Sequence, residues 1–251
     1  SPPRDIRIAF VEPNSPATNA GLLRGAKILT IDGINVVSST GTANVNAING
    51  ALSPKAIGES HTFTFEVNGV AQSPVQLTAA KITSTPVQNV QVIDTGSGRV
   101  GYLLFNDHIT TSETQLINAV NTFKQGAGIQ DLVLDMRYNG GGQLLIASRL
   151  AYMIASPSVT AGKTFEQLVF NDKNPFHLTV AQTLTPFTAT SRSGQALPTL
   201  GLSRVTVLTG PDTCSASESV VNSLRGVGVT VNLVGGTTCG KPYGFYPQDN
   251  C

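Results

Sequence analysis

Two strand–loop–helix units in the second half of the chain constrain its fold most. The first runs from the apolar strand 129–134 to a helical pattern of apolar residues over 145–154. The second runs from the strand 205–208 to a similar pattern over 220–224, and a strand at 99–104 precedes both units. Each strand ends in a stretch rich in residues that break regular structure. This alternation predicts an α/β layer structure for the second half of the chain.

Composition indicates a folded protein and excludes some classes of partner. The chain has 251 residues, of which 40% are hydrophobic and 12% charged, so it can form real cores. A net charge of +1 without a basic run argues against nucleic acid or an anionic membrane as the principal partner. No apolar stretch approaches the roughly 18 residues that span a bilayer. The residues therefore predict no membrane span, and they leave the oligomeric state open.

The serine at the start of the second helix is a candidate nucleophile. Ser215 and Glu218 fit the Ser-x-x-Glu capping box, which places Ser215 at the helix N-terminus. Unpaired N–H groups and the positive end of the helix dipole favour a developing negative charge at that position. Taken alone, the motif is more often a simple helix cap.

A glycine run between the first strand and its helix is a candidate oxyanion-binding loop. Gly140, Gly141 and Gly142 follow Asp135 and would expose backbone N–H groups of the kind that bind an anion or an oxyanion. A tight turn or a phosphate loop are the alternatives. A phosphate loop requires Gly-Lys-Ser/Thr, whereas Gln143 follows these glycines.

Four motifs in order resemble the carboxyl-terminal processing (tail-specific) serine protease family. They are Gly101-Tyr102-Leu103-Leu104, the Asp135–Gly142 run, Ser215-Ala216-Ser217-Glu218 and Thr238-Cys239-Gly240-Lys241. The resemblance implies a serine endopeptidase with a Ser215–Lys241 dyad, in which neutral Lys241 takes the serine proton. Backbone N–H groups of Ala216 and of Gly140 or Gly141 would hold the oxyanion. It also implies the spiral fold shared with Clp proteases and crotonases.

The N-terminal third is similar to the PDZ module that precedes the protease core in this family. Residues 14–22, Gly25 and 28–33 resemble the part of a PDZ domain that runs from a strand through a short helix into the next strand. Only five residues precede Ile6, so the family's carboxylate-binding loop and its strand are expected to be missing from this PDZ-like domain.

These resemblances predict three segments. They are a PDZ-like domain over 1–82, a turn-rich linker over 83–98 with one short strand in it, and a protease core over 99–251. The family continues with further strands where this chain stops, ten residues after Lys241, which suggests a trimmed chain. Residues 156–202 interrupt the alternation with several prolines and are interpreted as an irregular excursion near the site or a surface loop.

The resemblance further implies protein or peptide substrates with unstructured C-termini, captured by the PDZ-like part through strand addition.

One residue departs from the family pattern. Phe245 stands where the family has a glutamine four residues after the lysine, so Tyr243 or Gln248 would have to position Lys241 instead. Apolar neighbours of Lys241 are expected to favour its neutral form. The alternative function is a non-catalytic peptide-binding or scaffold protein of the same fold.

Other chemistries are less well supported by the residues. A histidine mechanism would have to use His108, because His61 lies in the PDZ-like part and His177 in the excursion. A thiol nucleophile at Cys214 would need the helix N-terminal position that Ser215 occupies. No spacing of histidines, cysteines and carboxylates indicates a metal site, and no cofactor is expected.

Three cysteines bear on the compartment. Cys239 could pair with Cys251 to close a loop around Lys241, or with Cys214 to tie the serine loop to the lysine loop. A composition rich in polar residues with few charges favours a periplasmic, cell-surface or secreted protein. Three reduced cysteines in a cytosolic protein are the alternative.

Overall fold

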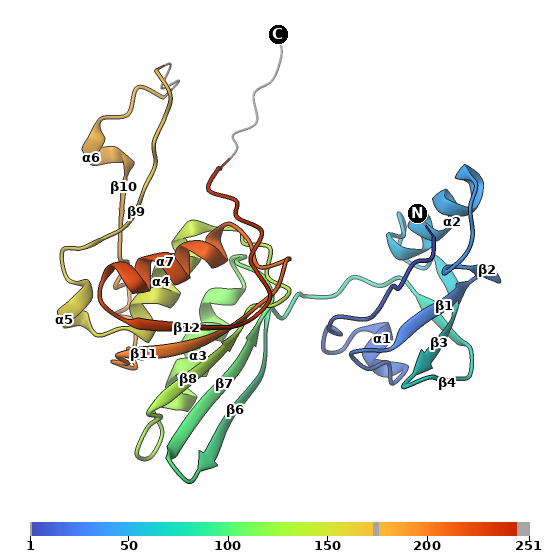
Figure 1. Ribbon diagram of the computed structural model, residues 1–251, viewed down its shortest axis with the longest axis horizontal. Helices are drawn as coiled ribbons and strands as arrows, with labels where there is room; N and C mark the ends of the chain where they lie inside the picture. The colour runs from blue at the N-terminus through green and yellow to red at the C-terminus, as the bar shows by residue number, and fades with distance from the viewer. Residues whose placement is uncertain (1, 173–175, 245–251) are drawn as a thin grey trace. The chain divides into compact units, whose positions relative to one another are not determined.

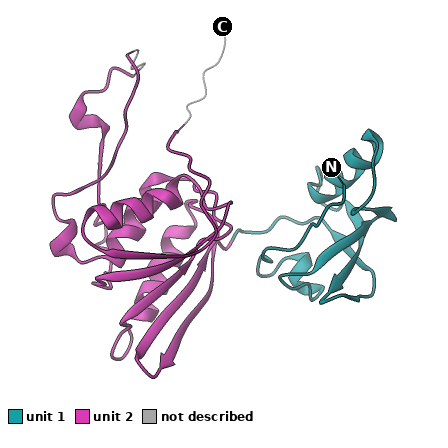
Figure 2. Ribbon diagram, viewed as in Figure 1, with its two compact units in different colours: residues 1–84 teal, residues 85–251 magenta. Residues whose placement is uncertain are grey.

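The computed structural model describes residues 2–172 and 176–244, which form two compact units. The first unit covers Ser1–Ser84 and the second Thr85–Cys251 (Figure 2). Each unit has its own hydrophobic core. Among the described residues, no helix is both long and apolar enough to cross a membrane.

The first unit is a small five-stranded antiparallel sheet with two helices. Its elements are α1 (Pro16–Asn19), β1 (Lys27–Ile31), β2 (Ile34–Asn35), α2 (Thr42–Leu52), β3 (Ser60–Val67), β4 (Val70–Ala71) and β5 (Val75–Thr78). The strands lie in the order β2-β1-β3-β4, and β5 also pairs with β3. Alternate residues of β3 face the core, with Phe63 and Phe65 buried against Ile31 of β1 and Ile48 of α2. The prediction that this unit is a PDZ-like domain remains a prediction.

The second unit is an α/β layer structure built on a five-stranded sheet (Figure 1). Its main elements are β6 (Val87–Thr95), β7 (Gly98–Phe105), α3 (Ser112–Phe123), β8 (Asp131–Asp135), α4 (Leu144–Ile154), β11 (Arg204–Thr209), α7 (Ala216–Gly226) and β12 (Thr230–Gly235). The sheet order is β12-β11-β8-β7-β6. Strands β7, β8, β11 and β12 are parallel, and β6 runs antiparallel to β7. The expected α/β alternation is present, whereas the spiral of Clp proteases and crotonases remains a prediction.

The three long helices form a layer against this sheet. Helix α3 contacts α4, and α4 contacts α7, in the order of the crossovers that connect the parallel strands. The core between the layers is apolar and closed: Leu134 of β8, Val207 of β11 and Leu150 of α4 are all fully buried. This packing holds the loops that follow β8 and β11 at a single edge of the sheet.

Strand β6 lies where the sequence suggested a linker. Residues 87–95 pair with β7 along most of their length and belong to the second unit, so the two units divide at Ser84. The strand is longer than the short strand predicted there, and its pattern is interrupted by a register shift between Gln88 and Gln91, where Asn89 has a φ of 53°. Val87 nevertheless joins the core of the second unit.

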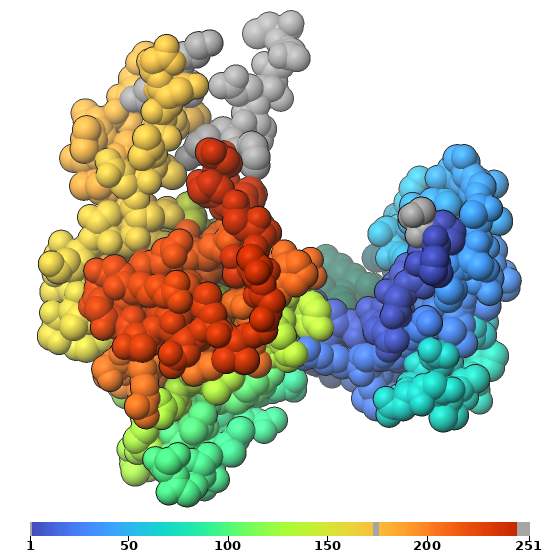
Figure 3. All heavy atoms as spheres, in the orientation of Figure 1, coloured from blue at the N-terminus to red at the C-terminus, as the bar shows by residue number. Residues whose placement is uncertain are grey.

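The excursion between α4 and β11 carries its own short elements. They are α5 (Pro157–Thr160), β9 (Thr164–Gln167), α6 (Val180–Thr183) and β10 (Leu184–Pro186), and the β9–β10 arm projects from the rest of the unit (Figure 3). A buried ion pair between Arg149 and Glu113 anchors the returning chain. Arg149 Nε donates to Thr190 O at 2.8 Å, and Glu113 Oε1 accepts from Arg192 N at 2.9 Å. These contacts hold the second half of the excursion against the core of the unit.

We expect residues 85–251 to fold cooperatively on their own and residues 99–251 to fail to do so. The longer fragment keeps β6, which pairs with β7 and contributes Val87 to the core, whereas the shorter one leaves an edge strand and apolar surface exposed. Thermal unfolding followed by circular dichroism would compare the two fragments. A cooperative transition of equal midpoint in both would mean that β6 is dispensable, as a linker would be.

Candidate active site

The loops that follow β8 and β11 meet at the carboxyl edge of the sheet. The two strands are parallel neighbours, with Asp135 opposite Leu208, so both chains leave the sheet side by side. Three hydrogen bonds then join the loops: Met136 N donates to Leu208 O at 3.0 Å, Thr213 Oγ1 to Met136 O at 2.8 Å and Cys214 N to Asn139 O at 3.1 Å. In open α/β sheets, this edge is where ligands bind.

Ser215 lies on a strained turn between β11 and α7. It is the N-cap residue of α7, it is partly buried, and its φ of 55° and ψ of −116° fall in a region that residues with side chains rarely adopt. Glu218 accepts from the Ser215 N–H at 2.8 Å, as a capping box requires. A sharp, strained strand-to-helix turn is the setting in which α/β hydrolases present a nucleophilic serine. The capping-box prediction is therefore confirmed, and the backbone strain adds an observation that no sequence pattern signals.

The glycine loop packs directly against this serine. A Cβ atom on Gly141 would lie 2.9 Å from Ser215 Cβ and 2.8 Å from Cys214 O, and the φ of Gly141 is +99°. A side chain is therefore excluded here by both contact and backbone conformation. The glycines thus allow the two loops to approach closely.

Gly140 and Gly141 were predicted as alternative donors to the oxyanion, and the structure distinguishes between them. The Gly141 N–H already donates to Asn139 Oδ1 at 3.0 Å, so it is not available to an oxyanion in this conformation. No such bond uses the Gly140 N–H among the described residues. Ala216 is the first residue of α7, and its N–H has no partner within the helix. Among the described residues of the two loops, the N–H groups of Gly140 and Ala216 are therefore the candidate donors to an oxyanion.

Asn139 joins three loops at this edge, and the sequence did not single it out. Its side chain is fully buried, its Oδ1 accepts from His108 Nδ1 at 3.0 Å as well as from Gly141, and its Nδ2 donates to Phe105 O at 3.0 Å. Its carbonyl accepts from Ser217 Oγ at 3.0 Å. An asparagine before a glycine predicts only a turn, so the pattern held no sign of these contacts.

His108 supports the glycine loop from inside the protein. It is fully buried against Phe105, with ring centroids 4.5 Å apart, and its backbone N–H donates to Gly141 O at 3.1 Å. Because Asn139 Oδ1 can only accept, Nδ1 carries the proton, and Nε2 has no hydrogen-bond partner among the described residues. Burial lowers the pKa of His108 to about 4, against the hydrogen bond to Asn139. The ring is neutral at physiological pH.

A second buried polar group lies at the end of β8. Burial acts to raise the pKa of Asp135, but hydrogen bonds from Arg137 and Tyr102 outweigh it and hold that pKa below its ordinary value. Arg137 donates Nε to Oδ1 at 2.9 Å, and the Tyr102 hydroxyl donates to Oδ2 at 2.8 Å. This ionised network fixes the start of the glycine loop.

Glu218 connects Ser215 with the segment that contains Lys241. Its Oε1 accepts from Thr238 Oγ1 at 2.7 Å and from the Gly240 N–H at 2.8 Å. Its Oε2, which binds the Ser215 N–H, also accepts from the Lys241 N–H at 2.9 Å. One carboxylate therefore brings the backbones of both predicted dyad residues together.

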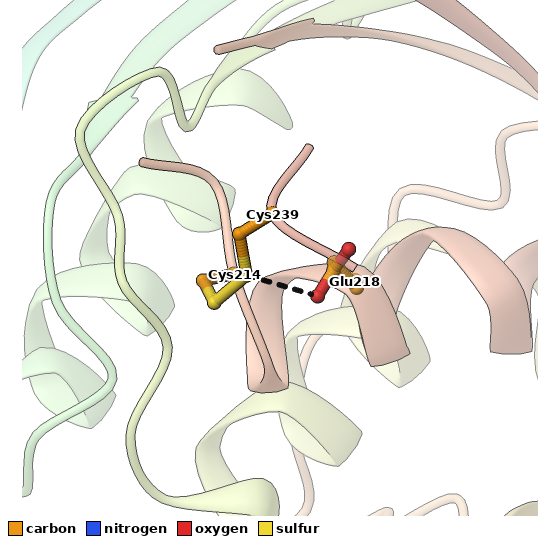
Figure 4. A group of neighbouring side chains, drawn as sticks. All are labelled: Cys214, Glu218 and Cys239. Atoms are coloured by element: carbon orange, nitrogen blue, oxygen red, sulfur yellow. Dashed lines mark hydrogen bonds between the residues drawn. A yellow bond between two sulfur atoms is a disulfide. The ribbon is translucent and has the colours of Figure 1, made fainter. Parts of the chain in front are cut away.

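A disulfide joins the same two segments. Cys214 and Cys239 are bonded, with Cα atoms 5.2 Å apart, and the bond lies beside Glu218 at the start of α7 (Figure 4). Of the pairings that the sequence left open, the structure contains the one between the serine and lysine loops. Cys214 consequently has no free thiol, which removes it as a nucleophile. The two sulfurs and Glu218 form a cluster of potential metal ligands, yet a disulfide offers no thiolate to a metal ion.

The expected apolar surroundings of Lys241 are not found in the described residues. Residues 239–244 are all exposed, and Tyr243 retains 71% of its accessible surface. This segment follows the last strand of the sheet and lies on the surface. The predictions made for Phe245, Gln248 and Cys251 concern positions outside the described residues.

Comparisons with a family model and with a curated relative both point to one protein family. A family model described as Peptidase family S41 matches residues 99–244. A carboxyl-terminal-processing protease of Picosynechococcus sp. is 27% identical over 240 residues, which cover 94% of this chain and 50% of that protein. The chain thus spans half the length of this relative.

Two solved structures share the fold. One, from Bacteroides fragilis and assigned to the S41 proteases, has a TM-score of 0.70 and 27% identity over 93% of this chain and 59% of its own. The photosystem II D1 C-terminal processing protease has a TM-score of 0.50 and 22% identity over 94% of this chain and 57% of its own, and shows the fold alone.

We expect acid to destabilise the second unit through His108. Since its folded-state pKa of about 4 lies below the ordinary 6.5, the unfolded state takes up a proton first, and stability is lost as the pH falls from 6.5 to 4. A shift of this size corresponds to about 3 kcal/mol. Urea unfolding at several pH values should show a shallower pH dependence for His108→Gln. The control is His177→Gln at an exposed position, and parallel curves for His108→Gln and wild type would contradict the assignment.

Proposed function

The chain belongs to peptidase family S41, and on that premise we propose that it is a serine endopeptidase with a Ser215–Lys241 dyad. The observation that carries the proposal is the junction of the two segments. Ser215 lies on a strained turn against the glycine loop, and the Glu218 carboxylate that accepts its N–H also accepts the N–H of Lys241. A helix cap alone would need neither the close glycine loop nor the lysine.

The reaction follows from these positions. Lys241, in its neutral form, removes the Ser215 hydroxyl proton while Oγ attacks the substrate carbonyl carbon, and the carbonyl oxygen becomes an oxyanion. The N–H groups of Ala216 and Gly140 stabilise that oxyanion. Collapse of the tetrahedral intermediate breaks the C–N bond, and the Lys241 ammonium protonates the leaving amine. Water then hydrolyses the acyl-enzyme by the same steps in reverse.

Closure by the substrate is part of this proposal, because Lys241 lies on an exposed segment. A bound polypeptide that covers residues 239–244 would exclude water from the lysine and favour its neutral form. The scaffold alternative lacks a comparable use for Ser215 and Lys241 together.

The substrates we propose are proteins with unstructured C-termini. The similarity to a carboxyl-terminal-processing protease supports this class. The first unit has a cavity of about 390 Å³, which is lined by apolar residues such as Leu22, Phe65 and Val75. This cavity is a candidate binding site for an apolar side chain of the substrate. The Cys214–Cys239 disulfide supports an exported protein, because disulfides persist in oxidising compartments.

Ser215→Ala should abolish cleavage of a disordered substrate that ends in an apolar tail, while the thermal midpoint changes little. A nucleophile contributes orders of magnitude to the rate, whereas loss of a helix cap costs about 1 kcal/mol of stability. Ser219→Ala, one turn further along α7, is the matched control and should cleave like wild type. Equal cleavage by Ser215→Ala and wild type would refute the nucleophile assignment. Absence of cleavage by the wild type, together with retained peptide binding, would favour the scaffold function.

Lys241→Arg should reduce kcat at least a hundredfold with the fold intact. Arginine keeps the positive charge but cannot give up its proton in the accessible pH range, so an electrostatic role would survive the change and a general-base role would not. The matched control is Lys124→Arg at the exposed end of α3. Full activity of Lys241→Arg would refute the general-base role of the lysine.

A further inference from the structure

We propose that the Cys214–Cys239 disulfide positions the lysine segment, so that peptidase activity depends on its oxidised state. The inference rests on the proposed Ser215–Lys241 dyad and extends it. Cys214 directly precedes Ser215, and Cys239 stands two residues before Lys241. The bond therefore links the two proposed dyad residues covalently through Cys214, Cys239 and Gly240.

The lysine segment lies on the surface, outside the apolar core. Residues 239–244 are exposed, and they contribute nothing to the apolar core of the second unit. Thr238, Gly240 and Lys241 donate hydrogen bonds to Glu218, and Cys239 N donates to Thr213 O at 3.0 Å. A hydrogen bond to an ionised carboxylate contributes about 1.5–3 kcal/mol, but the bonds from Gly240 and Lys241 are exposed, so water competes for the same groups.

The backbone around the bond also favours movement once it is broken. Gly240, between Cys239 and Lys241, has a φ of +73° and no atom within 4 Å of a Cβ position, so the chain there is neither packed nor restricted by a side chain. A displacement of about 1 Å at a catalytic group can cost about a hundredfold in rate. Loss of the covalent tie should therefore affect catalysis before it affects the fold.

The bond is open to a dithiol reductant. Cys239 is exposed and Cys214 is half-buried. A reductant thiolate attacks Cys239 Sγ, the Cys214–Cys239 bond breaks, and Cys214 leaves as a thiolate that takes up a proton. The second thiol of the reductant then attacks the mixed disulfide and releases Cys239. Two electrons pass to the protein cysteines, and the reductant becomes a cyclic disulfide.

The test compares oxidised and dithiothreitol-reduced full chain in a Cys251→Ala background, which removes the third cysteine. EDTA is present throughout, because the reduced cysteines and Glu218 could bind a metal ion. We expect reduction to lower kcat at least tenfold on the disordered substrate while KM stays within twofold. Reoxidation should restore kcat, and the variant carrying Cys214→Ala and Cys239→Ala should match the reduced form without responding to the reductant.

Hydrogen exchange separates positioning from a general loss of structure. Reduction should speed exchange at the Gly240 and Lys241 amides, which donate to Glu218, and leave the amides of β8 and β11 protected. Unchanged kcat and unchanged exchange after reduction would overturn the proposal. So would a loss of activity that accompanies cooperative unfolding of the second unit. If the oxidised chain is inactive, or cleaves equally with Ser215→Ala, the proposed function fails instead, and the exchange experiment still decides whether the bond holds the segment.

Discussion

The Glu218 carboxylate accepts hydrogen bonds from two segments that are separated by more than twenty residues, and the geometry of the site depends on it. It binds the N–H of Ser215 at the start of α7 and the Thr238, Gly240 and Lys241 donors beyond β12. Only an ionised carboxylate offers enough lone pairs for four donors. Burial acts to raise the pKa of Glu218, but these hydrogen bonds outweigh it and hold the pKa below its ordinary value. The group therefore stays charged, and the two segments remain joined at neutral pH.

The parallel sheet supplies the other half of the arrangement. Because β8 and β11 are neighbours with the same direction, the glycine loop and the serine loop emerge together. Buried polar groups then determine how they meet. Asn139 is satisfied by His108, Phe105 and Gly141, and each bond draws on a different loop or strand end. A buried amide is costly unless every donor and acceptor is paired, so this residue allows few alternative conformations.

Sequence patterns predicted the features that are determined by residues close together in the chain. Strands β7, β8 and β11, helices α4 and α7, and the Ser215–Glu218 box followed from periodicity and capping. Long-range contacts were beyond such patterns. The disulfide partner of Cys214, the bond that occupies the Gly141 N–H and the exposure of Lys241 all depend on how distant segments pack. The length of strand β6 was underestimated for a related reason, since its irregular pairing weakens the alternation that marks a strand.

The strained backbone of Ser215 explains why so many constraints converge on one turn. A residue with a side chain at φ 55° and ψ −116° costs about 1–3 kcal/mol, and such a conformation persists only where the surroundings enforce it. Here the N–H is held by Glu218, the preceding residue is held by the disulfide and by Asn139, and Gly141 packs against the Cβ atom. Each of these contacts acts on the serine loop. Glu218 and the disulfide also contact the lysine segment. Strain at the proposed nucleophile and placement of the proposed base are therefore maintained by the same contacts.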